Sequence, residues 1–174
     1  MSKFGTKAIH AGTEPDSATG AIMTPIYQTS TYIQNAPGEH KGYEYSRTLN
    51  PTRHVLEKNL AALENGNYGL TFSSGLAAMD ALLKSFKPGD EIISSNDLYG
   101  GSYRLFTKVF TDFGLKFHFV EMDDVTKVES LINVNTKMIW IETPTNPMMN
   151  IIDIKAISNL AKQYNILSAV DNTF

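Results

Sequence analysis

Small residues stand between a predicted strand and a predicted helix in the run Phe72-Ser73-Ser74-Gly75-Leu76-Ala77-Ala78. The first N–H groups of a helix have no partner inside it, and small residues let an anion approach them. The pattern therefore fits a phosphate held at Ser74, Gly75 and Leu76, and it fits equally a Ser-Gly turn that merely caps a helix. No Gly-x-Gly-x-x-Gly and no Gly-x-x-x-x-Gly-Lys-Ser/Thr motif occurs, which argues against dinucleotides and nucleotide triphosphates.

A carboxylate at Asp171 closes the apolar run Ile166-Leu167-Ser168-Ala169-Val170. Ligands of parallel sheets bind beyond the carboxyl ends of the strands, and a partly buried carboxylate there requires a cationic or donor partner. A protonated ring nitrogen would serve. The alternative is that Asp171-Asn172-Thr173 is a polar turn that leaves the sheet.

Two further segments carry an arginine or a tyrosine where a ligand would benefit from one. Tyr45 and Arg47 follow each other closely, and the arginine fork suits a phosphate or a carboxylate. Tyr99 follows the second predicted strand and precedes Gly100-Gly101, so its ring would lie over the same crevice and stack on a planar cofactor. Taken singly, these residues fit a solvent-facing arginine and an ordinary tyrosine beside glycines equally well.

Alternating β-rich and helical runs supply the elements that would position these residues. We expect strands near 68–72, 91–94, 116–121, 137–142 and 166–170 and helices near 76–86, 102–113, 125–132 and 154–164. A further helix should begin after an Asn50 cap, with Pro51 in its first turn, and end near Glu64. Strands separated by helices imply crossover connections, so we expect an α/β fold with a mostly parallel sheet and flanking helices.

The first 48 residues show little periodicity and many Gly, Pro, Ser and Thr residues, which is typical of an extended arm. The arm also carries apolar groups such as Ile22, Ile26 and Tyr32, which need a surface to bury against. A neighbouring subunit would supply that surface. We therefore expect an arm for subunit contacts over 1–48, followed by a cofactor-binding domain over 49–174.

Composition excludes several function classes. The chain has 15 Lys and Arg against 18 Asp and Glu, a formal net charge of −3, and no cysteine in 174 residues. Without a basic excess we expect no nucleic-acid binding, and without cysteine there is neither a disulfide nor a thiolate site. The four histidines show no metal-ligand spacing, so no metal is expected. No apolar segment reaches signal-peptide or bilayer length, so we expect a cytoplasmic protein that does not enter a membrane.

Together these segments resemble the transsulfuration, or Cys/Met-metabolism, family of pyridoxal 5′-phosphate (PLP) enzymes. The similarity covers the whole chain. It is most specific in the following runs: Ala8-Ile9-His10-Ala11-Gly12, Pro25-Ile26-Tyr27-Gln28-Thr29-Ser30-Thr31-Tyr32, Tyr45-Ser46-Arg47-Thr48-Leu49-Asn50-Pro51-Thr52, Ser74-Gly75-Leu76-Ala77-Ala78, Tyr99-Gly100-Gly101, Glu142-Thr143-Pro144-Thr145-Asn146-Pro147 and Asp171-Asn172-Thr173-Phe174. The resemblance implies the PLP-dependent transferase-like fold, fold type I, of which this chain would hold the N-terminal part.

The resemblance assigns the phosphate of PLP to the backbone amides of Gly75 and Leu76. It also implies that Tyr45 and Arg47 reach into a neighbouring subunit's site to bind that phosphate. The active site would then be shared between chains of a homo-oligomer, expected to be a tetramer built as a dimer of dimers.

Around the pyridine ring, Tyr99 resembles the tyrosine that stacks on the ring and helps to move protons, and Asp171 resembles the carboxylate that pairs with the ring nitrogen. Thr173 matches a threonine beside the cofactor. Asn146 matches a residue near the cofactor's 3′-oxygen and the substrate carboxylate, and Arg104 matches a substrate-side arginine of γ-lyases.

The activity implied is PLP-dependent cleavage of a carbon–sulfur bond in a small sulfur amino acid. Leu76, at a position where synthases and methionine γ-lyases commonly have Met, and the run 140–147 favour a cystathionine γ-lyase, which splits L-cystathionine into cysteine, 2-oxobutanoate and ammonia. Gly101 stands where methionine γ-lyases carry a cysteine. Cystathionine γ-synthase and β-lyase activities remain alternatives, as does, outside this family, a generic α/β nucleotide-binding module.

The family's Schiff-base lysine lies in a Ser-x-Thr-Lys motif beyond Asp-Asn-Thr-Phe, and no lysine follows Asp171 here. We therefore expect that the 174 residues lack that lysine and a smaller C-terminal domain, and that alone they are inactive. The chain would then be the first part of a longer enzyme. The alternative is a truncated, non-catalytic subunit that acts only by association.

Overall fold

The computed structural model describes residues 3–174. The chain forms two compact units, Met1–Phe72 and Ser73–Phe174.

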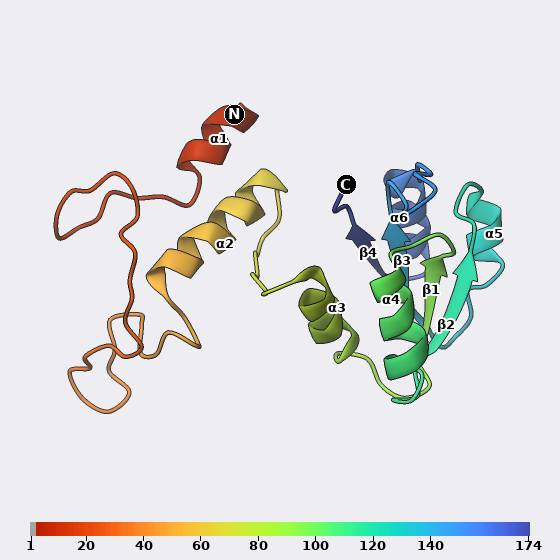
Figure 1. The fold of residues 1–174 in the computed structure, drawn as a ribbon, viewed down its shortest axis with the longest axis horizontal. Helices are drawn as coiled ribbons and strands as arrows, with labels where there is room; N and C mark the ends of the chain where they lie inside the picture. Colours follow the sequence, from red (N-terminus) through yellow and green to blue (C-terminus); the bar gives the residue numbers. More distant parts are fainter. Residues whose placement is uncertain (1–2) are drawn as a thin grey trace. The chain divides into compact units, whose positions relative to one another are not determined.

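The second unit contains a four-stranded sheet in the order β2-β1-β3-β4, with every neighbouring pair parallel (Figure 1). The strands span Glu91–Ser95 (β1), Lys116–Val120 (β2), Thr136–Glu142 (β3) and Leu167–Asp171 (β4). The helices span Gly75–Leu83 (α3), Gly100–Leu105 (α4), Val125–Glu129 (α5) and Ile154–Gln163 (α6). The predicted parallel sheet with flanking helices is confirmed.

Alternate residues of the strands pack against helices on opposite faces of the sheet. Ile92 and Met138 belong to a core cluster shared with α3 and the end of α4, whereas Ile93 and Ile139 belong to a cluster shared with α5 and α6. Because successive side chains of a strand point to opposite faces, covering both faces buries consecutive apolar residues. This explains why consecutive residues are apolar at 92–93 in β1 and at 138–141 in β3.

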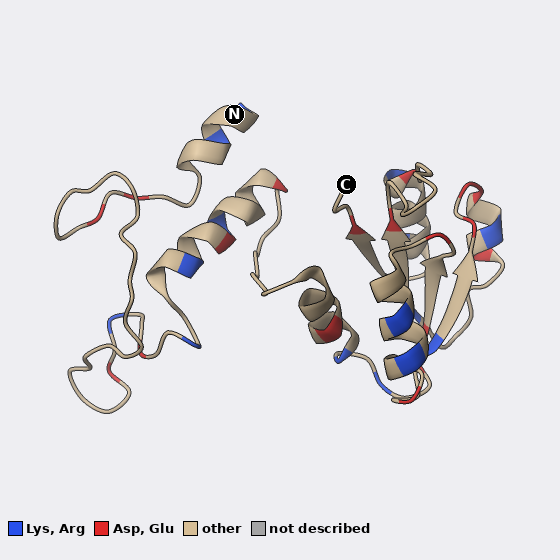
Figure 2. Cartoon of the chain, viewed as in Figure 1, with Lys and Arg blue, Asp and Glu red and all other residues tan. Residues whose placement is uncertain are grey.

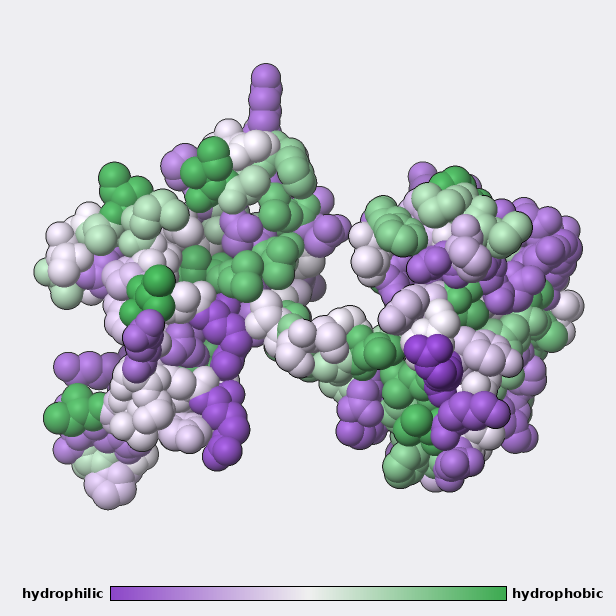
Figure 3. Space-filling view, in the orientation of Figure 1, coloured by the Kyte–Doolittle hydropathy of each residue, from purple (hydrophilic) through white to green (hydrophobic). Residues whose placement is uncertain are grey.

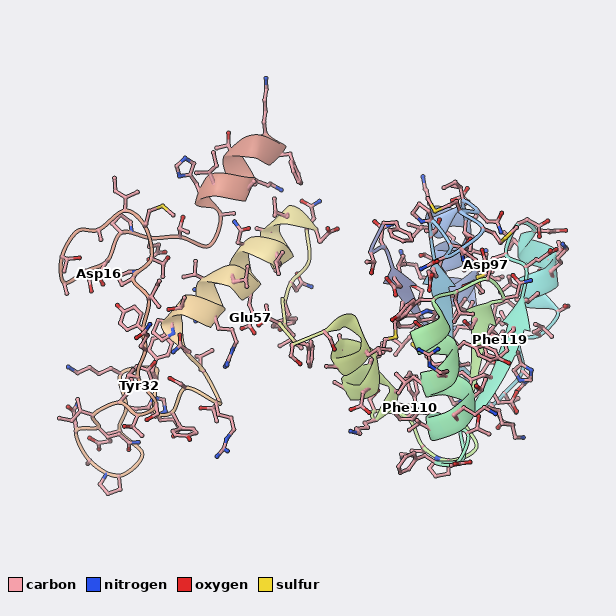
Figure 4. All side chains as sticks on the ribbon, in the orientation of Figure 1. Asp16, Tyr32, Glu57, Asp97, Phe110 and Phe119 are labelled. Atoms are coloured by element: carbon pink, nitrogen blue, oxygen red, sulfur yellow. The ribbon has the colours of Figure 1, made fainter. Side chains whose placement is uncertain are left out.

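The helix expected over 102–113 begins earlier and changes type. Helix α4 starts at Gly100 and continues as a π-helical segment over Phe106–Phe110, in which the N–H and hydroxyl of Thr111 donate to the Phe106 carbonyl. Phe106 and Phe110 are both buried in the cluster under α3 and α4, which Phe119 of β2 borders (Figure 4). Two aromatic side chains of this segment thus pack on the sheet.

The first unit holds two helices, α1 over Phe4–His10 and α2 over Pro51–Leu63. The predicted start of α2 is confirmed, since the Asn50 side chain accepts the Thr52 N–H at 2.9 Å. Helix α1 was not expected, because seven residues are too few to show a periodic pattern. Hydrophobic side chains along α2, among them Leu56 and Leu60, are exposed on this unit (Figure 3).

The strand expected over 68–72 is absent, and these residues form no regular secondary structure. Their backbone lies on α2 instead: a Cβ at Gly69 would lie 2.9 Å from the Glu57 carbonyl carbon, and the Glu57 carboxylate accepts the Thr71 N–H at 3.2 Å (Figure 4). Tyr68 is 90% exposed. The β-rich composition was misleading because no neighbouring strand pairs with this segment.

Candidate functional site

A cavity of about 410 Å³ lies in the second unit beyond the carboxyl ends of β3 and β4. This volume falls in the range of small-molecule sites. Its walls come from the start of α3, the start of α4, the end of β3 with the loop that follows it, and the end of β4. It is lined by Ser74, Gly75, Leu76, Met79, Tyr99, Glu142, Pro144, Asn146, Asp171, Thr173 and Phe174.

The start of α3 forms one end of this cavity. The Ser74 side chain caps the helix by accepting the Ala77 N–H at 3.1 Å. Across residues 3–174, the amides of Gly75 and Leu76 have no protein acceptor. Nothing lies within 4 Å of the place where a Gly75 side chain would begin. Two free amides at the positive end of a nine-residue helix form a site for an anion.

Tyr99 forms an aromatic wall of the cavity and is the residue from which α4 begins. Its ring lies close to Gly101, the second residue of α4, and the residue is 47% exposed. Its backbone N–H donates to both carboxylate oxygens of Glu142, each at 2.9 Å. The backbone of Tyr99, whose ring lines the cavity, is thus held by the end of β3.

Asp171 ends β4 and pairs in register with Glu142 of β3. Its Oδ1 atom accepts the Thr173 N–H at 3.2 Å and the Thr173 hydroxyl at 2.5 Å. In the part of the chain that the structure describes, no Lys, Arg or His side chain forms an ion pair with it. The carboxylate therefore retains acceptor capacity for a cationic donor in the cavity.

Glu142 is a cavity residue to which the sequence reasoning gave no role. Its side chain is buried, with the residue 4% exposed, and accepts N–H groups from Tyr99 and, at 3.1 Å, from Asn146. Burial raises the pKa of its carboxyl, the Tyr99 hydrogen bond lowers it, and the nearby charge of Asp171 raises it further. Acidic residues end both β3 and β4 (Figure 2). The rule that singled out Asp171 would therefore have found Glu142 too.

The loop after β3 carries Asn146 into the cavity wall. The Glu142 carboxylate holds its backbone, and Asp97, from the loop after β1, braces the same loop by accepting the Thr145 hydroxyl and, at 3.0 Å, the Met148 N–H (Figure 4). A carboxylate at the end of β3 and another from the loop after β1 thus fix the conformation of this loop.

Three of the predicted site residues do not line this cavity. Arg104 is exposed on α4, with its guanidinium near Gly100. Tyr45 and Arg47 belong to the first unit, where the Arg47 guanidinium lies 5.0 Å from the centre of the Tyr45 ring. This cation–π contact pairs the two side chains with each other, and their binding of a phosphate stays a prediction.

Within residues 3–174, no group of three or more His, Cys, Asp or Glu side chains could hold a metal ion. None of the helices described is long and apolar enough to cross a membrane.

Comparison with known proteins gives a consistent result. Residues 5–174 match the family profile described as Cys/Met metabolism PLP-dependent enzyme. A probable cystathionine gamma-synthase of Herpetosiphon aurantiacus is 52% identical over 98% of this chain and 54% of its own length. A cystathionine beta-lyase of Coxiella burnetii is 49% identical over 99% of this chain and 45% of its own length.

The crystal structure of cystathionine gamma-lyase from Lactobacillus plantarum, complexed with L-serine, superimposes with a TM-score of 0.94. It is 46% identical and covers 98% of this chain, which in turn covers 45% of that chain. The predicted fold type I arrangement is confirmed by this match. The chain spans about half the length of the curated relatives it matches.

Proposed function

Because the chain belongs to the Cys/Met metabolism family of PLP-dependent enzymes, we propose that it binds PLP in the cavity beyond β3 and β4 and serves carbon–sulfur bond chemistry. The observation that carries the proposal is the composition of that cavity. Free amides at a helix start, an aromatic face and a carboxylate without a protein cation line one space.

This set of groups fits the parts of PLP. The amides of Gly75 and Leu76 suit the phosphate, and the open space at Gly75 leaves room for it to approach the backbone. The ring of Tyr99 suits a stacked pyridine, since aromatic pairs favour offset contact. The carboxylate of Asp171 suits a protonated ring nitrogen as a charge-assisted acceptor.

PLP, when bound, supplies an electron sink that makes the α-proton of an amino-acid substrate acidic. Asp171 holds the ring nitrogen in its protonated form, because a neighbouring negative charge favours the cation. Thr173 orients that carboxylate through two hydrogen bonds to Oδ1. Tyr99 holds the pyridine ring by stacking and helps to move protons. Asn146 orients the substrate carboxylate, and Arg104 lies on the side of the site that receives the substrate.

Within the family, γ-elimination of L-cystathionine to cysteine, 2-oxobutanoate and ammonia is the activity that we propose. Leu76 and Gly101 support this choice. Because the relatives include a gamma-synthase, a beta-lyase and a gamma-lyase at similar identity, γ-replacement and β-elimination are the competing activities. All three involve the same cavity and differ in the bond that is broken or formed.

We also propose that the arm serves a second copy of the chain, with Tyr45 and Arg47 binding the phosphate in the partner's site, in a cytoplasmic tetramer. The exposed apolar side chains of the first unit, such as Ile22 and Ile26, support this role. Mixing the Arg47→Ala and Asp171→Ala variants of the full-length protein tests it. If sites are shared, about a quarter of the sites in a random mixture are intact and activity returns. No recovery would exclude a shared site.

The principal experiment measures binding and products together. The mass of the purified protein is recorded, PLP is titrated in, and binding is followed by visible absorbance. L-Cystathionine is then added to the full-length protein, because the 174 residues alone are expected to be inactive. Appearance of 2-oxobutanoate with cysteine indicates γ-elimination, pyruvate with homocysteine indicates β-elimination, and a new thioether formed from added cysteine indicates γ-replacement. Absence of any PLP-dependent absorbance would overturn the proposal.

A further inference from the structure

One buried side chain, Glu142, contacts two walls of the cavity at once. Its Oε1 and Oε2 atoms both accept the Tyr99 N–H at 2.9 Å, and Oε1 also accepts the Asn146 N–H at 3.1 Å. Tyr99 and Asn146 are 47 residues apart in sequence and come from different elements. The carboxylate thus joins the two main chains through hydrogen bonds.

The Glu142 carboxylate is itself rigidly placed. Its residue ends β3, its backbone N–H donates to the buried Ser95 hydroxyl at 3.3 Å, and its strand neighbour is Asp171. Side chains on the end of a central strand are held more precisely than those on loops. Glu142 can therefore serve as a fixed point for the two loops that it contacts.

Glu142 carries a charge that no cation balances among the residues described, since it enters none of their ion pairs. The neighbouring charges recorded for it are those of Asp171 and Asp97, which are also negative. Burying such a carboxylate costs free energy unless backbone donors solvate it. Here those donors are the N–H groups of Tyr99 and Asn146. The hydrogen bonds that stabilise the buried Glu142 carboxylate therefore also hold both cavity walls in place.

We propose that Glu142 is a positioning residue that fixes the Tyr99 ring and the Asn146 side chain in the cavity by accepting hydrogen bonds from their backbone N–H groups. The effect that we expect on PLP binding rests on the proposed function. The positioning of Tyr99 and Asn146 by Glu142 does not depend on it. Because α4 begins at Tyr99, a shift of that main chain moves both the ring and the first turn of the helix.

The Glu142→Gln variant separates the effect of these hydrogen bonds from the effect of side-chain size. Glutamine keeps one oxygen but replaces the other by an NH₂ donor. That donor would face the Tyr99 N–H, and two donors cannot satisfy each other. Glu142→Gln should therefore release Tyr99 while filling the same volume. Glu121→Gln is a matched control, because Glu121 follows β2 at the same edge of the sheet but is exposed and pairs with Lys127.

Hydrogen exchange of the Tyr99 amide in PLP-free protein is the first readout. We expect exchange to be at least about tenfold faster in Glu142→Gln, because one charge-assisted hydrogen bond is lost. Exchange in Glu121→Gln should be unchanged. The second readout is PLP affinity, expected to fall about tenfold in Glu142→Gln alone. Unaltered exchange and affinity in Glu142→Gln would overturn the proposal.

A measurement on the wild-type protein decides the matter if Glu142→Gln does not fold. NMR titration should show the Tyr99 and Asn146 amide proton shifts moving with the midpoint of the Glu142 carboxyl carbon. Amide shifts that ignore that titration would overturn the proposal. Failure of the proposed function is distinguishable, because it appears as wild-type protein that does not bind PLP while Tyr99 still follows Glu142.

Discussion

Gly101 lies so close to the Tyr99 ring that a side chain at this position would collide with the ring. A Cβ at 101 would stand 2.9 Å from Cδ1 and 3.0 Å from Cζ of the ring. Gly100, one residue earlier, has no such neighbour, since its Cβ would meet only the Arg104 guanidinium at 3.5 Å. Two adjacent glycines of α4 thus have different neighbours, and of the two only Gly101 contacts the Tyr99 ring.

Gly101→Ala should displace the Tyr99 ring from its place in the cavity. We expect PLP affinity to fall about tenfold, because stacking contacts are worth about 0.5–1.5 kcal/mol, while the half-exposed ring swings outward at small cost in stability. Titration with PLP, followed by absorbance, measures the effect. Gly100→Ala is the control and should bind PLP as wild type does. Equal affinities for all three proteins would show that Gly101 does not place the ring.

Two substitutions at Ser74 separate helix capping from anion binding. Ser74→Ala removes the acceptor for the Ala77 N–H, and the free energy of unfolding without PLP should fall by about 1 kcal/mol. Ser74→Asp retains a good cap, so stability should change by less than about 0.5 kcal/mol. Its negative charge would repel a phosphate, and PLP affinity should fall more than in Ser74→Ala. Urea unfolding and PLP titration measure the two quantities. Tighter PLP binding by Ser74→Asp would contradict a phosphate at this helix start.

Asp171→Asn should weaken PLP binding by about ten- to a hundredfold, because hydrogen bonds to charged partners are worth about 1.5–3 kcal/mol. The amide keeps the shape and can still accept from Thr173, so the fold should be retained. Circular dichroism verifies the fold, and absorbance titration gives the affinity. Asp123→Asn changes an exposed carboxylate paired with Lys127 and serves as the control. A wild-type affinity in Asp171→Asn would remove this carboxylate from the cofactor site.

At the opposite edge of the sheet, Glu91 gives a prediction about pH. Its residue is 6% exposed, and it accepts from Asn133 and His118, each at 2.8 Å. The hydrogen bond from Asn133, followed by that from His118, lowers its pKa from 4.5 to about 2. The unfolded chain therefore binds more protons in that interval, so Glu91 stabilises the fold above pH 4.5 and loses this contribution as the pH falls toward 2.

Glu91→Gln should lower the free energy of unfolding at pH 7 by about 1–3 kcal/mol, and the difference from wild type should shrink at pH 3. Urea unfolding at both pH values gives the comparison. Asp80→Asn, at an exposed i,i+4 pair with Lys84, should show little effect at either pH. A deficit in Glu91→Gln that is the same at pH 3 and pH 7 would mean that ionisation of Glu91 is not its source.

Much of the second unit could be predicted from local patterns. β-Rich runs near β1 and β3 indicated strands, and their alternation with helices indicated parallel connections. The Asn50 cap of α2 and the Ser74 cap of α3 followed from residue type alone, because a cap depends on a few neighbouring residues. The seven-residue helix α1 and the π-helical segment at Phe106 left no comparable local signal.

The segment 68–72 shows where local pattern fails. Its aromatic and β-branched residues favour a strand, but a strand needs a partner, and the neighbour that Gly69 meets is the backbone of α2 at Glu57. Likewise, the roles of Tyr45 and Arg47 cannot follow from the first unit alone, where the two side chains contact each other.

The sequence by itself determined the chemical types at the cavity, since Gly75, Tyr99 and Asp171 were singled out by their places after predicted strands. Only the tertiary structure decided how they are held. Glu142 and Tyr99 are 43 residues apart, and nothing local connects them. The parallel sheet brings the end of β3 beside the loop after β1, and there a buried carboxylate must find donors, which the Tyr99 and Asn146 main chains supply.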